Sequence, residues 1–212
     1  NIHGVNMVTH EMNILVASDF NSEGLVRYLN YDVDSPMVKV VGGQFGSAQV
    51  LLFTPGNIDD FNSYDAVVVW TLPELSIPTY KAATEYHNVD IEKALDEVDL
   101  YCDAVAKVHT HIKTIVVPTW IMPPKQRGYG LMDLVPGVGV KYLLMRMNQR
   151  LAENLSSLGG VYVLDTERWM ARSGFDGVDL KLWFVGKIYF RPEVFKAAVK
   201  DIKATLRAIR GP

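Results

Sequence analysis

Five short apolar runs divide the chain, and stretches with helical periodicity separate most of them. The runs are Asn13–Ala17, Val38–Val41, Ala66–Trp70, Thr114–Val117 and Val161–Leu164. Because these runs are continuous rather than alternating, they are typical of strands buried on both faces of a sheet. No hairpin signal such as Asn-Gly stands between consecutive runs. We therefore predict an α/β fold, a three-layer sandwich with a five-stranded, mostly parallel sheet.

Apolar residues recur at helical spacing in four further stretches. They predict a helix with Asn21 or Ser22 as its N-cap, and helices over 89–112, 140–158 and 193–210. Between the second and third of these helices, residues 118–139 contain four of the chain's ten prolines and four glycines. A long loop that follows a strand is a common place for functional residues.

Composition narrows the class of protein. At 212 residues, with 49% hydrophobic and 21% charged residues, we expect one domain over 12–212, preceded by a flexible segment 1–11. The net charge of −3 argues against nucleic acid as a partner, and no apolar stretch is long enough for a membrane span. Cys102 is the only cysteine, which excludes an intramolecular disulfide and favours a cytoplasmic location.

Ligand sites in parallel sheets lie outside the carboxyl ends of the strands. Ser18 and Asp19 follow the first strand there. Asp19 is a candidate catalytic or orienting carboxylate, and a turn aspartate is the equally simple alternative. Ser18 would be a nucleophile only with a base within hydrogen-bond reach, and otherwise it is a turn serine. These two residues are the candidate catalytic pair.

Other strand ends offer candidate binding groups. Gly43 and Gln44 could present backbone amides to an oxyanion, or only make a turn. Aromatic residues suited to stacking against a sugar or a pantetheine-like chain, although more often found in cores, are Trp120, Tyr129, Trp169, Trp183 and Tyr189. His109 and His111 are spaced so that they do not share a helical face, and no cluster completes a ligand set. We expect no metal site and no cofactor in this chain.

Several blocks of the sequence carry a family resemblance. They are 14–21, 43–46, 69–74, 117–120, 148–151, 161–169, 182–188 and 204–211, and they span nearly the whole chain. In these blocks the chain resembles the N-terminal region of FkbH-like proteins. The resemblance implies an SGNH-hydrolase-like domain with flavodoxin-like strand order, followed in that family by a HAD-type (subfamily IIIC) phosphatase domain. We expect ligand contacts from Asn21, Gly43, Gln44, Thr71, Trp120, Asn148 and Lys187.

The resemblance also implies a pathway. Proteins of this family load a glyceryl group onto an acyl carrier protein or similar acceptor during polyketide or surface-glycan synthesis, and that chemistry belongs chiefly to the HAD-type domain. The chain departs from the hydrolase pattern at three positions. Phe20 stands at the nucleophile, Pro73 at the oxyanion asparagine, and Arg191 at the histidine of the Asp-x-x-His pair. These departures predict that the Ser-His-Asp triad is lost.

Three interpretations of function follow. The first is a non-catalytic domain that binds a carrier-linked acyl group, a glyceryl or sugar-type ligand, or the neighbouring HAD-type domain, through a pocket around Asp19, Asn21, Gly43 and Trp120. The second is an active hydrolase or acyltransferase with substitute residues, with Ser18 as nucleophile. The third is a docking unit whose strand ends are plugged by Trp70 and Phe20. An open polar pocket at the strand ends would favour the first interpretation, a base within reach of Ser18 the second, and a filled cavity the third.

Overall fold

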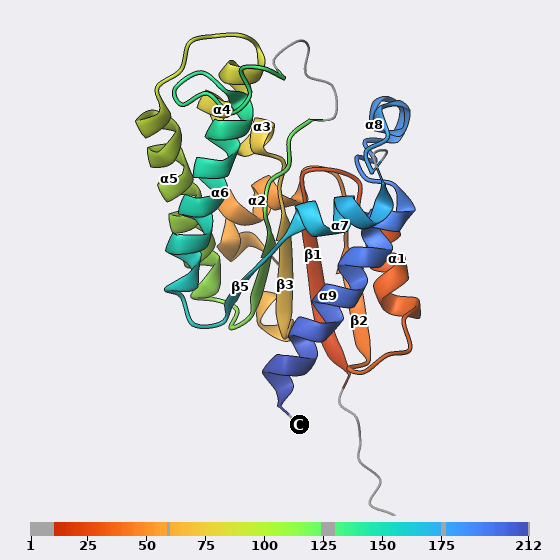
Figure 1. The fold of residues 1–212 in the computed structure, drawn as a ribbon. Coiled ribbons are helices and arrows are strands. Elements are labelled where there is room, and N and C mark those ends of the chain that lie inside the picture. Colours follow the sequence, from red (N-terminus) through yellow and green to blue (C-terminus); the bar gives the residue numbers. More distant parts are fainter. Residues whose placement is uncertain (1–10, 59, 124–129, 175–176, 212) are drawn as a thin grey trace, which may run out of the picture.

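The computed structural model describes residues 11–58, 60–123, 130–174 and 177–211. Its centre is a five-stranded sheet in the order β2-β1-β3-β4-β5, and all four pairings are parallel (Figure 1). The strands are β1 (Met12–Ser18), β2 (Val38–Gly42), β3 (Ala66–Trp70), β4 (Ile115–Pro118) and β5 (Val161–Leu164). This confirms the predicted α/β sandwich, its strand order, and each predicted strand to within one residue at either end. The predicted flexible segment falls, except for Glu11, outside the described residues.

Helices cover both faces of the sheet (Figure 1). The four predicted helices are α1 (Glu23–Tyr31), α5 (Ile91–His109), α6 (Val140–Ser156) and α9 (Pro192–Arg210). The described residues form five more α-helices, which the sequence did not predict: α2 (Ser47–Phe53), α3 (Pro73–Ser76), α4 (Pro78–Thr84), α7 (Thr166–Ser173) and α8 (Leu180–Gly186). Each of these has eight residues or fewer, too short for apolar periodicity to show in the sequence. No described helix is both long and apolar enough to cross a bilayer.

Strand β3 shows how the sheet divides the core in two. Val67 and Val69 point into the layer formed with α2, α4, α5 and α6. Val68 and Trp70 point into the opposite layer, formed with α1, α7 and α9. Because successive side chains of a strand face opposite sides, an all-apolar run fills both layers. Each valine buried in this way contributes roughly 1.5–3 kcal/mol.

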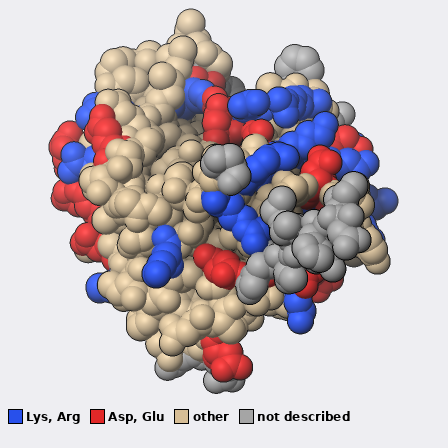
Figure 2. All heavy atoms as spheres, turned by 90° about the horizontal axis from the view of Figure 1, so that it is seen from below, with Lys and Arg blue, Asp and Glu red and all other residues tan. Residues whose placement is uncertain are grey.

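Helix α9 packs between α1 and α7 and is strongly amphipathic. Its outward face carries the exposed Lys196, Lys200 and Arg207. Seen from below in Figure 2, basic side chains gather on one part of the surface, so charge is unevenly distributed although the net charge is small. One lysine of α9 points inward instead. Lys203 is buried, and its ammonium group lies 3.6 Å from the carboxylate of Asp32.

Candidate functional site

The turn after β1 holds Ser18 in a closed set of hydrogen bonds. The side chain is fully buried. Its hydroxyl donates to the Phe20 carbonyl at 2.7 Å and lies 2.7 Å from the hydroxyl of Ser22. Its backbone N–H donates to the hydroxyl of Ser47 at 3.0 Å. These contacts are those of a turn serine, and they favour that interpretation over the nucleophile.

Asp19 links three segments at the strand-end edge, which is the edge of the sheet where the carboxyl ends of the parallel strands lie. One carboxylate oxygen accepts the backbone N–H of Leu72 at 2.9 Å, and the other accepts the side-chain amide of Gln49 at 2.9 Å. The residue is fully buried, and burial raises the pKa of its carboxyl group. The bonds from Leu72 and Gln49, together with the Ser76 hydroxyl, oppose that rise. Asp19 therefore ties the end of β1 to the turn after β3 and to α2, and a catalytic or orienting role toward a ligand stays a prediction.

A second carboxyl group interacts electrostatically with Asp19. Glu74 is in the short helix α3, and burial raises the pKa of its carboxyl group to about 7, with the charge of Asp19 adding to the rise. Burial raises the pKa of Tyr80 and of Tyr189, and the charge of Glu74 adds to the rise in both. We call these four residues the acid–tyrosine cluster. It brings together the end of β1, α3, α4 and the segment between α8 and α9.

The sequence assigns no role to Glu74 or Tyr80, and to Tyr189 only a candidate stacking role. Glu74 is visible as the carboxylate that follows the third strand, and Tyr189 as one of several aromatic residues suited to stacking. Tyr80 gives no local signal, because it lies in a helix too short to be predicted. Tyr129, the other tyrosine proposed for stacking, lies outside the described residues.

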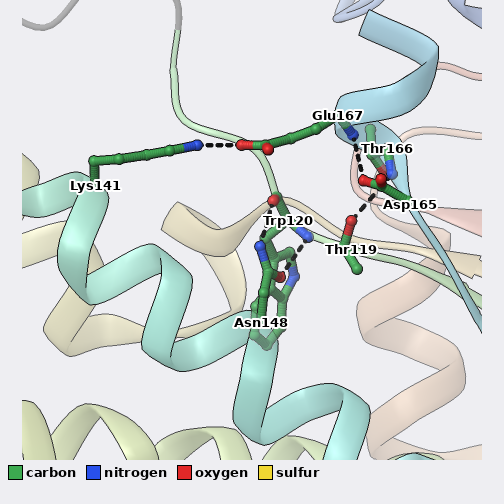
Figure 3. A network of polar contacts seen from close by, with 7 residues as sticks. All are labelled: Thr119, Trp120, Lys141, Asn148, Asp165, Thr166 and Glu167. Carbon is green, nitrogen blue, oxygen red and sulfur yellow. Dashed lines mark hydrogen bonds and ion pairs between the residues drawn. The ribbon is translucent and has the colours of Figure 1, made fainter. Parts of the chain in front are cut away.

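Three of the expected ligand-binding residues meet in one hydrogen-bonded brace. The Thr71 hydroxyl accepts the indole N–H of Trp120 at 2.9 Å and lies 3.0 Å from the hydroxyl of Tyr101. Asn148 of α6 makes two bonds to the Trp120 backbone, at 2.9 and 2.8 Å (Figure 3). Thr71 and Trp120 are both buried. The brace fixes the start of the loop after β4, and a role in ligand contact stays a prediction.

Beside the brace, α7 is anchored to the sheet and to α6 (Figure 3). The Thr119 hydroxyl accepts the backbone N–H of Thr166 at 3.0 Å, and Asp165 caps α7 by accepting the backbone N–H of Glu167 at 3.0 Å. The Glu167 carboxylate pairs with Lys141 of α6. A cleft of about 420 Å³ lies here between α6 and the ends of β4 and β5, and Asn148 lines it.

The other expected ligand-binding residues gather on the β1–β2 side of the edge. The Asn21 N–H donates to the Lys187 carbonyl at 2.7 Å, and the Lys187 ammonium group lies over the Trp183 ring, 5.1 Å from its centroid. Asn21 lines a groove of about 490 Å³ beside α1, and Gln44 lines a separate one of about 380 Å³ at α2. The structure thus places the expected binding residues in two groups.

Gly43 has a structural reason to be glycine. Its φ is +87°, and a Cβ atom would come within 3.0 Å of the backbone at Ser22 and Glu23. Its N–H donates to the Val16 carbonyl at 2.9 Å, and its own carbonyl accepts the N–H of Ser22 at 2.8 Å. Since the amide already has a partner, these contacts favour the turn interpretation over an oxyanion donor.

The three positions at which the chain departs from the hydrolase pattern also have structural contacts. Phe20 is fully buried, with its ring centroid 5.3 Å from Trp70 and 5.1 Å from Phe190. Pro73 is the first residue of α3. Arg191 precedes α9, and its guanidinium group lies 3.8 Å from the Asp179 carboxylate. Within the described part of the chain, no group of three His, Cys, Asp or Glu side chains is arranged to hold a metal ion.

The proteins found to be similar to this chain are similar in structure. No family model and no curated protein sequence matches the chain. The N-terminal part of the protein BF1531 from Bacteroides fragilis, described as containing a phosphatase domain complexed with Mg, has a TM-score of 0.70 and 12% identity, over 95% of this chain and 53% of that one. This chain therefore spans about half the length of that one.

Enzymes of about the same length match as well. LAE5, an α/β hydrolase from the metagenome of Lake Arreo, Spain, has a TM-score of 0.57 and 11% identity, over 94% of this chain and 99% of its own. A mutant of Axe2, an acetyl-xylooligosaccharide esterase from Geobacillus, has a TM-score of 0.58 and 11% identity, over 95% of this chain and 97% of its own. At such identities the likeness is one of fold. The chain has an SGNH-hydrolase-like fold, and its resemblance to the N-terminal domain of FkbH-like proteins is confirmed at that level.

Proposed function

We propose that this chain is an SGNH-hydrolase-like domain that binds a carrier-linked acyl, glyceryl or sugar-type ligand at its strand-end edge and does not use a Ser-His-Asp triad. The observation that carries the proposal is the burial of the Phe20 side chain. In the hydrolase pattern this position supplies the nucleophilic hydroxyl. Here it supplies a phenyl ring that is fully buried among the rings of Trp70, Tyr189, Phe190 and Phe195.

The positions of the base and the oxyanion donor support the same conclusion. Arg191 stands at the histidine position, and a guanidinium group stays protonated and cannot accept a proton as a general base. Pro73 stands at the asparagine position and has neither a side-chain amide nor a backbone N–H. Triad members act as a unit, so replacing the nucleophile and the base together with an oxyanion donor removes the main contributions to acyl transfer.

The longer Bacteroides fragilis chain supports a further part of the proposal, namely that this domain works beside a phosphatase-type domain. That chain is described as containing a phosphatase domain with Mg, and this chain corresponds to about half of it. We propose that the domain works beside a HAD-type domain, in polyketide or surface-glycan biosynthesis, by holding the acyl carrier or its glyceryl group. This role rests on the family resemblance and on the fold likeness together.

Hydrolysis of p-nitrophenyl acetate tests the proposal. The wild-type chain should give no turnover above the buffer rate, and Ser18→Ala should not change this result. Ser157→Ala is the matched control, because Ser157 is exposed at the end of α6. Turnover that disappears in Ser18→Ala but persists in Ser157→Ala, with both variants folded by circular dichroism, would overturn the proposal in favour of the hydrolase with substitute residues.

A further inference from the structure

We infer that the groove beside α1 is a docking site for an acidic amphipathic helix of a partner protein. This groove has a volume of about 490 Å³ and is lined by residues of α1, of α8, of the segment between α8 and α9, and of the start of α9. These elements lie on the same side of the molecule (Figure 1). The inference adds a protein partner to the proposed function, and it does not depend on which small ligand the strand-end edge binds.

Apolar side chains line the groove on the side of α8 and α9. They are Leu182, Ile188, Phe190 and Phe195. Helix α8 has no buried residue, and two further apolar side chains on it, Phe184 and Val185, are 78% and 82% exposed. An apolar surface that continues from a groove onto an exposed helix is typical of an interaction site.

Two exposed cations stand on the α1 side of the groove. Arg27 lines it, and the guanidinium carbon lies 5.4 Å from the centroid of the Tyr28 ring, which also lines it. The ammonium group of Lys196 on α9 lies 5.6 Å from the same centroid. Among the described residues, neither cation forms an ion pair with a carboxylate. A ring holds a cation in place without neutralising it, so both charges stay available to an acidic partner.

The mixture of charge and apolar surface selects the kind of partner. The exposed Lys200 lies one turn after Lys196 on α9 and extends the basic surface, whereas Glu23 of α1 adds an acidic group to the lining. A nucleic-acid backbone would leave the apolar side chains unused and would meet the charge of Glu23. An amphipathic helix carries an apolar stripe beside its acidic face, so it matches both the apolar side of the groove and the cations.

An extended peptide is a poorer match than a helix. Strand β2 is the edge strand on this side of the sheet, and adding a strand to it requires free N–H and C=O groups. The side chain of Asn30 on α1 occupies both groups of Val40: its carbonyl accepts the Val40 N–H at 2.8 Å, and its amide donates to the Val40 carbonyl at 2.9 Å. The middle of the edge is therefore covered, and a partner must bind through its side chains.

Fluorescence anisotropy with the full chain and a labelled acidic peptide tests the inference. The peptide has about 18 residues, with leucines at helical spacing and glutamates on the adjoining face. It should bind saturably, and at least about tenfold more tightly than a scrambled peptide of the same composition or a peptide with lysine in place of glutamate. Because the two cations are exposed, affinity should fall as the salt concentration rises from about 0.05 M to about 0.5 M.

A double charge reversal tests the role of the cations. Arg27→Glu together with Lys196→Glu should weaken binding of the acidic peptide about tenfold or more. Lys93→Glu together with Lys107→Glu is the matched control, since both lysines are exposed on α5, which covers the other face of the sheet. The control makes the same change in net charge and should bind within about twofold of the wild type.

A truncation tests the apolar side of the groove. Leu182→Ala should weaken binding about threefold or more, because it removes apolar surface that the helix would cover. Leu100→Ala is the control, because Leu100 is 68% exposed on α5, and it should bind as the wild type does. Circular dichroism checks that each variant is folded.

Four results would overturn the inference. The first is no saturable binding of the acidic peptide below about 1 mM. The second is equal binding of the ordered and scrambled peptides, which would show only unspecific attraction of charge. The third is wild-type affinity in the double variant of Arg27 and Lys196. The fourth is tighter binding of a single-stranded oligonucleotide or of anionic vesicles that the same variant abolishes, which would identify a nucleic-acid or lipid site instead. Ester turnover, which tests the proposed function, is measured separately from all four.

Discussion

Replacing Phe20 with serine restores a hydroxyl at the position where hydrolases of this fold carry their nucleophile. The proposed function predicts that Phe20→Ser loses stability and gains no esterase activity. The side chain is fully buried, and four other aromatic rings lie within 6.4 Å of it, measured between ring centroids. In this chain the position belongs to the core between the sheet and α9.

The expected loss follows from two contributions. Removing a buried phenyl ring costs about 3–5 kcal/mol through lost burial and the cavity left behind. A serine hydroxyl without a partner in that cavity adds roughly 1–3 kcal/mol. We therefore expect a total loss of about 4–8 kcal/mol, a large share of the roughly 5–15 kcal/mol that stabilises a typical domain. Phe20→Leu, which largely fills the space, should cost about 1–2 kcal/mol.

Urea denaturation followed by circular dichroism measures these losses. Phe53→Ser is the matched control, since Phe53 is 80% exposed at the end of α2 and should change stability by less than about 0.5 kcal/mol. A Phe20→Ser variant that folds and loses less than about 1.5 kcal/mol would refute the reasoning. So would a Phe20→Ser or Phe20→Leu variant that hydrolyses p-nitrophenyl acetate.

Three further predictions concern charge and hydrogen bonding. Asp32→Ala should cost about 3 kcal/mol in urea denaturation, because the buried ammonium group of Lys203 loses its carboxylate and keeps only the backbone carbonyl of residue 32, 3.4 Å away. Lys203→Met should cost less than about 1 kcal/mol, and equal losses in the two variants would contradict this prediction. The pKa of Glu74 is about 7 in the folded chain against an ordinary 4.5, so its contribution to stability is full below pH 4.5 and is lost as the pH rises to about 7. Glu74→Gln should accordingly be more stable than the wild type by about 3 kcal/mol at pH 8 and not at pH 4, and an equal difference at both pH values would contradict it. Asn148→Ala removes both bonds to the Trp120 backbone and should cost about 2 kcal/mol in thermal unfolding, and an unchanged melting temperature would show that the brace does not stabilise the loop.

The sequence determined the strands and the long helices. A strand buried on both faces must be apolar throughout, so a run such as Ala66–Trp70 is recognisable without its neighbours. Helices such as α5 and α9 are long enough for an inward stripe to repeat several times. The order of strands also limits where a site can be, because the carboxyl ends of parallel strands share one edge. The structure confirms the shared edge, because all four strand pairings are parallel; a ligand site there stays a prediction.

Only the tertiary structure decided what the residues at that edge do. Ser18 and Gly43 could each be catalytic or structural by sequence, and the choice depends on which atoms their hydroxyl and amide groups meet. The acid–tyrosine cluster depends on electrostatic interactions between residues far apart in the chain, such as Glu74 and Tyr189, which no local pattern reveals. Hydrophobic periodicity is a property of neighbouring residues, whereas desolvation is a property of the folded surroundings.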